Sequence, residues 1–123
     1  MNALAIDYGS KRIGLAVSVN GIIMPLPVIA NNGTVMVNLQ QVVKKYQVER
    51  VFVGLSEGSF RLEIKKFVVR LRRVLKLNIE TVEESVSTIE AGQIYAANKK
   101  SKKDYKKTID SIAAAVILRR VSD

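Results

Sequence analysis

The chain has 123 residues, of which 48% are hydrophobic, and 20 Lys and Arg against 11 Asp and Glu give a formal net charge of +9. It contains neither cysteine nor histidine. This excludes disulfides, thiolate nucleophiles, zinc ribbons and every catalytic triad or metal site that uses imidazole. The length predicts a single domain over residues 1–123.

No apolar stretch approaches the roughly 20 residues that a membrane-spanning helix requires. The N-terminus lacks the pattern of a secretory signal, so we expect a cytoplasmic protein with no membrane span. The strong positive charge favours a polyanionic partner, such as nucleic acid or an anionic membrane surface, although such charge also serves solubility alone.

Three β-strands are expected at the start of the chain. Residues 2–7 and 12–19 are apolar-rich runs joined by the turn Gly9-Ser10-Lys11, which predicts a hairpin. A third run, residues 22–29, contains Pro25 and Pro27. Because proline cannot donate to a β-ladder, this strand should lie at a sheet edge.

Helices and strands alternate in the rest of the chain. A helical apolar period begins at residue 34, and residues 49–55 form a short apolar run typical of a strand covered on both faces. A second helix follows from residue 60 with Ser59 as a candidate N-cap, and then a fifth strand over residues 78–82. A third helix is expected near Thr88, followed by a lysine-rich loop at residues 98–107 and a last helix at residues 108–121.

This order of elements predicts an α/β fold. Three antiparallel strands come first, and right-handed crossovers then make the fourth and fifth strands parallel to the first. The result is a mixed five-stranded sheet with helices on both faces.

Acidic residues follow the strands that point the same way in this sheet. Asp7 ends the first strand, Glu83 and Glu84 follow the fifth, and Asp110 lies in the first turn of the last helix. Ligands of open α/β sheets gather at the carboxyl ends of the strands. Carboxylates brought together there repel one another unless a hard cation such as Mg²⁺ or Mn²⁺ binds between them. A pair of such ions about 4 Å apart supports phosphodiester hydrolysis.

Each acid also has a purely structural interpretation. Asp7 suits a turn in which its side chain accepts backbone N–H bonds. Glu83 and Glu84 suit a solvated strand end, and Asp110 suits the first turn of a helix, where it complements the dipole. The convergence of all of them at one sheet edge favours the metal site.

Four segments of the chain resemble, in order and spacing, the YqgF/RuvX family, and the resemblance spans essentially the whole chain. These segments are "IDYGSKRIGLAVS", "ERVFVGL", "EESVSTIEA" and "TIDSIAAAVIL". The resemblance implies an RNase H-like fold and a metal-dependent nuclease of a family described as Holliday junction resolvases and also assigned to pre-16S rRNA maturation. By position it implies that Asp7, Glu84 and Asp110 are the catalytic, metal-binding acids.

Two departures from the family pattern bear on activity. Ser56, in "GLSEGSF", replaces a proline, and Ser85 replaces an arginine that would hold a phosphate or orient a carboxylate. These departures motivate an alternative, a non-catalytic module that binds nucleic acid or the ribosome. Precursor rRNA and branched DNA remain alternative substrates, and a monomer and a weak homodimer remain alternative states.

Basic residues flank the predicted acidic centre on both sides. Lys11 and Arg12 follow Asp7, and the lysine-rich segment before Asp110 contains Lys102, Lys103, Lys106 and Lys107. Such residues suit a polyanion whose backbone is drawn into a negative pocket. The alternative for the lysine-rich segment is a solvated loop. The cations of the second helix either extend this nucleic-acid-binding surface or simply form the solvent-exposed face of that helix.

The opening segment has a second resemblance. Asp-x-Gly-Ser, here Asp7 to Ser10, is similar to the phosphate loop of actin-like ATPases and sugar kinases. Those proteins need two such domains around a nucleotide, and this chain has room for one.

Overall fold

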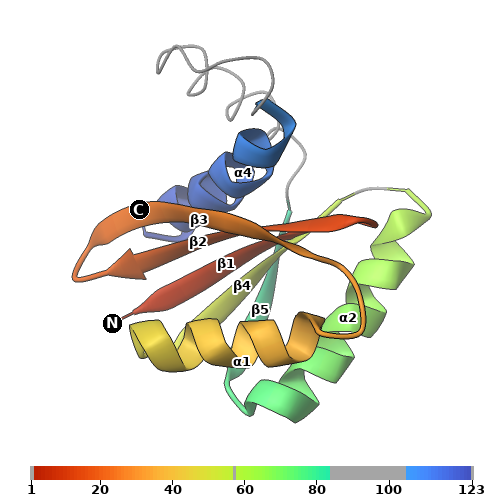
Figure 1. The fold of residues 1–123 in the computed structure, drawn as a ribbon, viewed down its shortest axis with the longest axis horizontal. Helices are drawn as coiled ribbons and strands as arrows, with labels where there is room; N and C mark the ends of the chain where they lie inside the picture. Colours follow the sequence, from red (N-terminus) through yellow and green to blue (C-terminus); the bar gives the residue numbers. More distant parts are fainter. Residues whose placement is uncertain (1, 57, 84–104, 123) are drawn as a thin grey trace.

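The computed structural model describes residues 2–56, 58–83 and 105–122, with the backbone alone at residues 105–110 and 122. Within these ranges the chain forms five strands and three helices (Figure 1). They are β1 (Ala3–Tyr8), β2 (Arg12–Val19), β3 (Ile22–Ala30), α1 (Val35–Tyr46), β4 (Arg50–Leu55), α2 (Phe60–Leu75), β5 (Asn78–Glu83) and α4 (Tyr105–Ser122).

The strands form one sheet in the order β3-β2-β1-β4-β5. β1 pairs antiparallel with β2 and parallel with β4, β2 pairs antiparallel with β3, and β4 pairs parallel with β5. This confirms the predicted mixed sheet of three antiparallel and two parallel strands. β1 lies at the centre, so its carboxyl end is held by a neighbouring strand on each side.

The proline-containing strand β3 lies at the edge of the sheet, as predicted. Pro25 and Pro27 therefore occupy a strand that has one neighbour among the described strands. Asn20 and Gly21, between β2 and β3, have φ angles of 53° and 81°. Two successive positive φ values match the right-handed twist of the hairpin, which explains the Asn-Gly pair at this turn.

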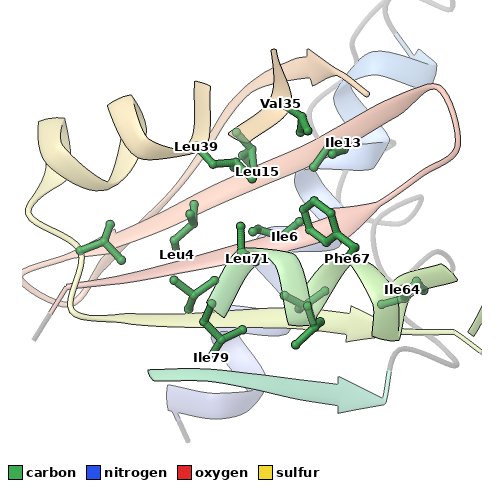
Figure 2. Packing of buried hydrophobic residues seen from close by; sticks show 14 of the residues in the cluster. Leu4, Ile6, Ile13, Leu15, Val35, Leu39, Ile64, Phe67, Leu71 and Ile79 are labelled. Carbon is green, nitrogen blue, oxygen red and sulfur yellow. The ribbon is translucent and has the colours of Figure 1, made fainter. Parts of the chain in front are cut away.

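Two hydrophobic clusters cover the two faces of the sheet. On one face, α1 and α2 pack against alternate strand residues, including Leu4 and Ile6, and Phe67 of α2 lies in this cluster (Figure 2). On the other face, α4 packs its alanines against Ala5 and Ala16. These small side chains allow α4 to approach the sheet closely, so helices lie on both faces, as predicted (Figure 1).

The structure differs from the sequence-based expectations at two helix starts. Ser59 occupies the N-cap position of α2 but makes no capping hydrogen bond. Its φ and ψ of −65° and −27° are helical, whereas a capping side chain needs an extended backbone. α4 begins at Tyr105 instead of residue 108. Tyrosine and lysine are compatible with helix, so nothing in residues 105–107 stops it.

The expected helix near Thr88 and residues 98–104 of the expected loop lie outside the described residues. None of the helices in the described part of the chain is both long and apolar enough to cross a bilayer.

Candidate active site

Asp7 lies on the α4 face of the sheet, at the carboxyl end of the central strand. Side chains alternate along a strand. Ala5 packs against α4 and Ile6 packs in the opposite cluster, so Asp7 shares the face of Ala5. The Asp7 side chain is half-buried. The predicted position of this acid, at the carboxyl end of β1, is therefore what the structure shows.

Glycines flank Asp7 on both neighbouring strands. Gly14 of β2 is its antiparallel partner. On β4, Val53 is the partner of Ile6, and Gly54 follows one residue further along the same parallel register. Neither neighbour has a side chain that would fill the space beside the carboxylate. A half-buried carboxylate in a chain without histidine or cysteine suits a hard, oxygen-preferring cation.

Ser111 fixes the N-terminal part of α4 against β2 and β3. Its buried hydroxyl donates to the carbonyl oxygen of Leu26 at 2.6 Å and accepts from the backbone N–H of Leu15 at 3.4 Å. Asp110 directly precedes Ser111, and Leu15 adjoins Gly14, the strand partner of Asp7. The backbone of Asp110 therefore adjoins the point where α4 is bonded to β2 and β3, and β2 is the strand that pairs with Asp7.

The hydroxyl of Ser111 occupies an irregular part of the β2–β3 pairing. Ile13 pairs with Ile29 but Leu15 pairs with Leu26, so one residue of β2 opposes two of β3. Such a bulge interrupts the ladder and leaves backbone groups without their usual partners. Ser111 supplies a partner to a donor on one strand and to an acceptor on the other.

We predict that Ser111→Ala lowers the free energy of unfolding by about 1–3 kcal/mol, because it leaves buried backbone groups without a partner. Urea unfolding measures this loss. Ser10→Ala removes the same hydroxyl from an exposed turn, and this control should change stability by less than about 0.5 kcal/mol. An unchanged urea midpoint for Ser111→Ala would show that the bridge contributes nothing.

The far end of α4 reaches β5. Arg120 donates from Nη1 to the carbonyl oxygen of Glu83 at 3.4 Å. The helix thus runs across the sheet from Ser111, at β2 and β3, to the last residue of β5, and β1 with Asp7 lies between these two anchors.

Glu83 is engaged away from the predicted centre. Arg61 of α2 binds it through two hydrogen bonds, Nη2 to Oε1 at 2.8 Å and Nη1 to Oε2 at 3.2 Å. The hydrogen bond to the Arg61 guanidinium holds the pKa of Glu83 below its ordinary value. Since α2 covers the face opposite α4, this carboxylate is committed to the other side of the sheet. Glu84 comes directly after it and lies outside the described residues, as does Ser85.

The turn beside Asp7 is held by Asn31, which sequence reasoning did not select. Its side-chain Nδ2 donates to the carbonyl oxygen of Gly9 at 2.9 Å. Its backbone N–H donates to the carbonyl oxygen of Lys11, also at 2.9 Å. A Cβ at Gly9 would overlap the carbonyl oxygen of Arg12. Only glycine fits this close approach.

The structure describes the predicted basic residues to different extents. Lys11 is exposed in the turn after Asp7, and Arg12 is the half-buried first residue of β2. Lys106 and Lys107 lie in the first turn of α4, where the backbone alone is described, and Lys102 and Lys103 lie outside the described residues.

The predicted metal ligands are thus placed to different extents. Among the described residues, no group of three acidic, histidine or cysteine side chains is positioned to hold a metal. Of the three predicted ligands, Asp7 has a described side chain, Asp110 a described backbone, and Glu84 follows the described end of β5. The structure places Asp7 at the end of β1 and bonds Ser111, the residue after Asp110, to the neighbouring strand β2.

Comparisons with known proteins agree with this architecture. The sequence matches the family described as "RuvX: Holliday junction resolvase" over residues 1–123. A relative from Desulforamulus reducens, named "Putative pre-16S rRNA nuclease", is 32% identical over 133 residues, covering 100% of this chain and 97% of the relative. A relative of the same name from Sulfurovum is 35% identical over 126 residues, covering 98% and 97%.

Solved structures show the same fold at low sequence identity. RuvC from Thermus thermophilus superimposes with a TM-score of 0.59 at 15% identity, covering 99% of this chain and 97% of RuvC. The fowlpox virus Holliday junction resolvase has a TM-score of 0.58 at 13% identity, covering 100% of both chains. These likenesses confirm the predicted RNase H-like fold, and with the family match over its whole length, the chain belongs to the RuvX family.

Proposed function

We propose that this chain is a metal-dependent endonuclease that hydrolyses phosphodiester bonds in structured nucleic acid. Asp7, Glu84 and Asp110 would hold two divalent ions, Mg²⁺ or Mn²⁺. The observation that supports this proposal is that Asp7 lies at the end of β1 on the α4 face, while Ser111, the residue after Asp110, is bonded to the adjacent strand β2. The names of its relatives, pre-16S rRNA nuclease and Holliday junction resolvase, support the substrate class.

The residues around Asp7 suit a site that must hold its geometry. Asp7 lies on the central strand, and Asn31 fixes the turn that follows it. Bound divalent ions would supply an activated water and stabilise the charge that develops on the leaving oxygen. Gly14 and Gly54, which lack side chains, would let a scissile phosphate approach the strand backbone next to the carboxylate.

The basic residues contribute attraction for the substrate. Lys11 is exposed within four residues of Asp7, and we assign it to contacts with the phosphate backbone together with Arg12, Lys102, Lys103, Lys106 and Lys107. Phosphate contacts position a nucleic acid without reading its sequence. This suits recognition of a branched or folded substrate by shape.

A side-by-side cleavage assay tests the proposal. A four-way DNA junction and a precursor 16S rRNA fragment are incubated with the protein in Mg²⁺, in Mn²⁺ and in EDTA. We expect cleavage of one substrate or both with either ion and none in EDTA. Binding without cleavage under every condition would instead support a non-catalytic module, the alternative that Ser85 motivates.

A further inference from the structure

The two helices on the face opposite α4 carry an unusual concentration of positive charge. α1 and α2 together contain eight Lys or Arg residues and a single acidic residue, Glu63. These helices cover the sheet face that Asp7 does not share, so their charge is separate from the basic residues assigned to the active site (Figure 1).

Some of the cations on α2 are already bound within the protein. Arg61 is paired with Glu83, Lys66 lies 3.9 Å from Glu63, and Arg72 donates to the carbonyl oxygen of Ile79 at 3.1 Å.

The other cations of α2 remain available. Among the described residues, no ion pair or hydrogen bond holds Lys65, Arg70 or Arg73, and all three are exposed. The charge of Lys65 helps to lower the pKa of Glu83, but the carboxylate itself is bound by Arg61. Charges that the protein does not satisfy internally are the ones available to an external polyanion.

These cations line the outer side of α2. Residues three, four and seven apart share one face of a helix. Ile64, Phe67 and Leu71 form the buried side. The opposite side is a continuous exposed strip, which we call the α2 stripe, consisting of Leu62, Lys65, Lys66, Val69, Arg70 and Arg73.

The α2 stripe begins at the same sheet edge as the candidate active site. α2 starts at Phe60, and the Phe60 ring packs on Tyr8, the residue after Asp7, with ring centroids 5.6 Å apart. From there the 16 residues of α2 extend about 24 Å at 1.5 Å per residue. That length corresponds to about seven base pairs of duplex at 3.4 Å each.

We propose that the α2 stripe binds the phosphate backbone of a duplex arm that flanks the cleavage point. This inference rests on the proposed nuclease function for the identity of the ligand. A nucleic acid held at the Asp7 edge and continuing along α2 would meet the exposed cations of the stripe in succession. Because lysine and arginine at a surface contact phosphates as charges, the binding is independent of sequence.

The test measures binding of duplex DNA and duplex RNA of about 20 base pairs, several times the span of α2. It is done in EDTA, so that cleavage plays no part. The triple variant Lys65→Gln, Arg70→Gln, Arg73→Gln should bind at least about tenfold more weakly at low salt. On DNA, log K decreases with log salt. The magnitude of this negative slope should shrink by about 0.9 for each phosphate that the variant no longer neutralises. The duplex whose affinity falls further identifies the arm that the stripe prefers.

A matched variant keeps the charge and changes the residues. Lys65→Arg, Arg70→Lys, Arg73→Lys should bind both duplexes within about twofold of the parent, because phosphate attraction follows charge. Parent-like affinity and salt slope in the glutamine variant would overturn the proposal. The proposal would also be overturned if the glutamine variant kept the affinity of the parent for duplex but had a different sedimentation coefficient. That result would assign the stripe, with Leu62 and Val69, to a contact between copies of this chain.

Failure of this proposal and failure of the nuclease proposal are distinguishable. If the protein binds duplex through the α2 stripe but never cuts with Mg²⁺ or Mn²⁺, the stripe proposal holds and the nuclease proposal is wrong. If the protein cuts, and its glutamine variant binds duplex as the parent does, the nuclease proposal holds and the stripe proposal is wrong.

Discussion

Asp7→Asn should reduce metal-dependent cleavage by well over a hundredfold while the protein remains folded. Loss of a residue that merely orients a metal ligand typically costs about 10–100-fold, and Asn removes the charge of a proposed direct ligand. The replacement has nearly the same shape, and Asp7 is half-buried beside two glycines, so crowding does not arise. The readouts are the single-turnover cleavage rate and the urea midpoint.

Neighbouring glutamates provide a matched control for this result. Glu84→Gln should abolish cleavage as Asp7→Asn does, because both are proposed ligands. Glu83→Gln removes an adjacent carboxylate that is already bound by Arg61, and it should leave the cleavage rate within a few-fold of the parent. Substrate binding in EDTA should persist in all three variants. If Asp7→Asn cleaves as fast as the parent, the assignment of the centre to Asp7 is wrong.

The strand order of the sheet was predictable because local signals specify it. Pro25 and Pro27 exclude β3 from the interior, and the Asn20-Gly21 pair marks the hairpin before it. Right-handed crossovers then leave one arrangement for β4 and β5. Each of these signals lies within a few residues of the element that it specifies.

Contacts between distant segments were not predictable in the same way. Ser111 and Leu26 are 85 positions apart, and their hydrogen bond depends on a bulge that leaves no mark in the local pattern. Asn31 belongs to an Asn-Asn-Gly segment that indicates a turn, but nothing in that segment shows that its side chain reaches back to Gly9. A polar serine directly before the alanine-rich, buried part of α4 was the one available signal.

The choice between two adjacent glutamates shows the same limit within the candidate site. The order of elements directs both Glu83 and Glu84 to the end of β5, and the family resemblance selects Glu84. The structure adds a physical reason, because Arg61 holds Glu83 against α2 through two hydrogen bonds. In the sequence Arg61 is one of several cations on an amphipathic helix, and its partner follows from the packing of α2 beside β5.

The largest effect on stability is expected at Phe67, which joins α2 to the end of β1. Phe67 lies within the buried cluster (Figure 2) and is 2% exposed. Its ring centroid lies 4.4 Å from that of Tyr8, the residue after Asp7. Phe67→Ala should lower the free energy of unfolding by about 3–5 kcal/mol, since it removes a buried ring and leaves a cavity. A domain has about 5–15 kcal/mol in total, so urea unfolding should show a large shift of the midpoint.

Two further variants separate the sources of this destabilisation. Phe67→Leu keeps an apolar side chain and should lose less, including about 0.5–1.5 kcal/mol for the aromatic interaction with Tyr8. Val69→Ala, on the exposed side of the same helix at 46% exposure, should change stability by about 0.5 kcal/mol or less. Because Phe67 lies on the α1–α2 face and Asp7 on the α4 face, the folded fraction of Phe67→Leu should still cleave. If Phe67→Leu folds as stably as the parent yet no longer cleaves, the packing of Phe67 on Tyr8 orients Asp7 directly, and Phe67 is then a positioning residue for the site as well as part of the core.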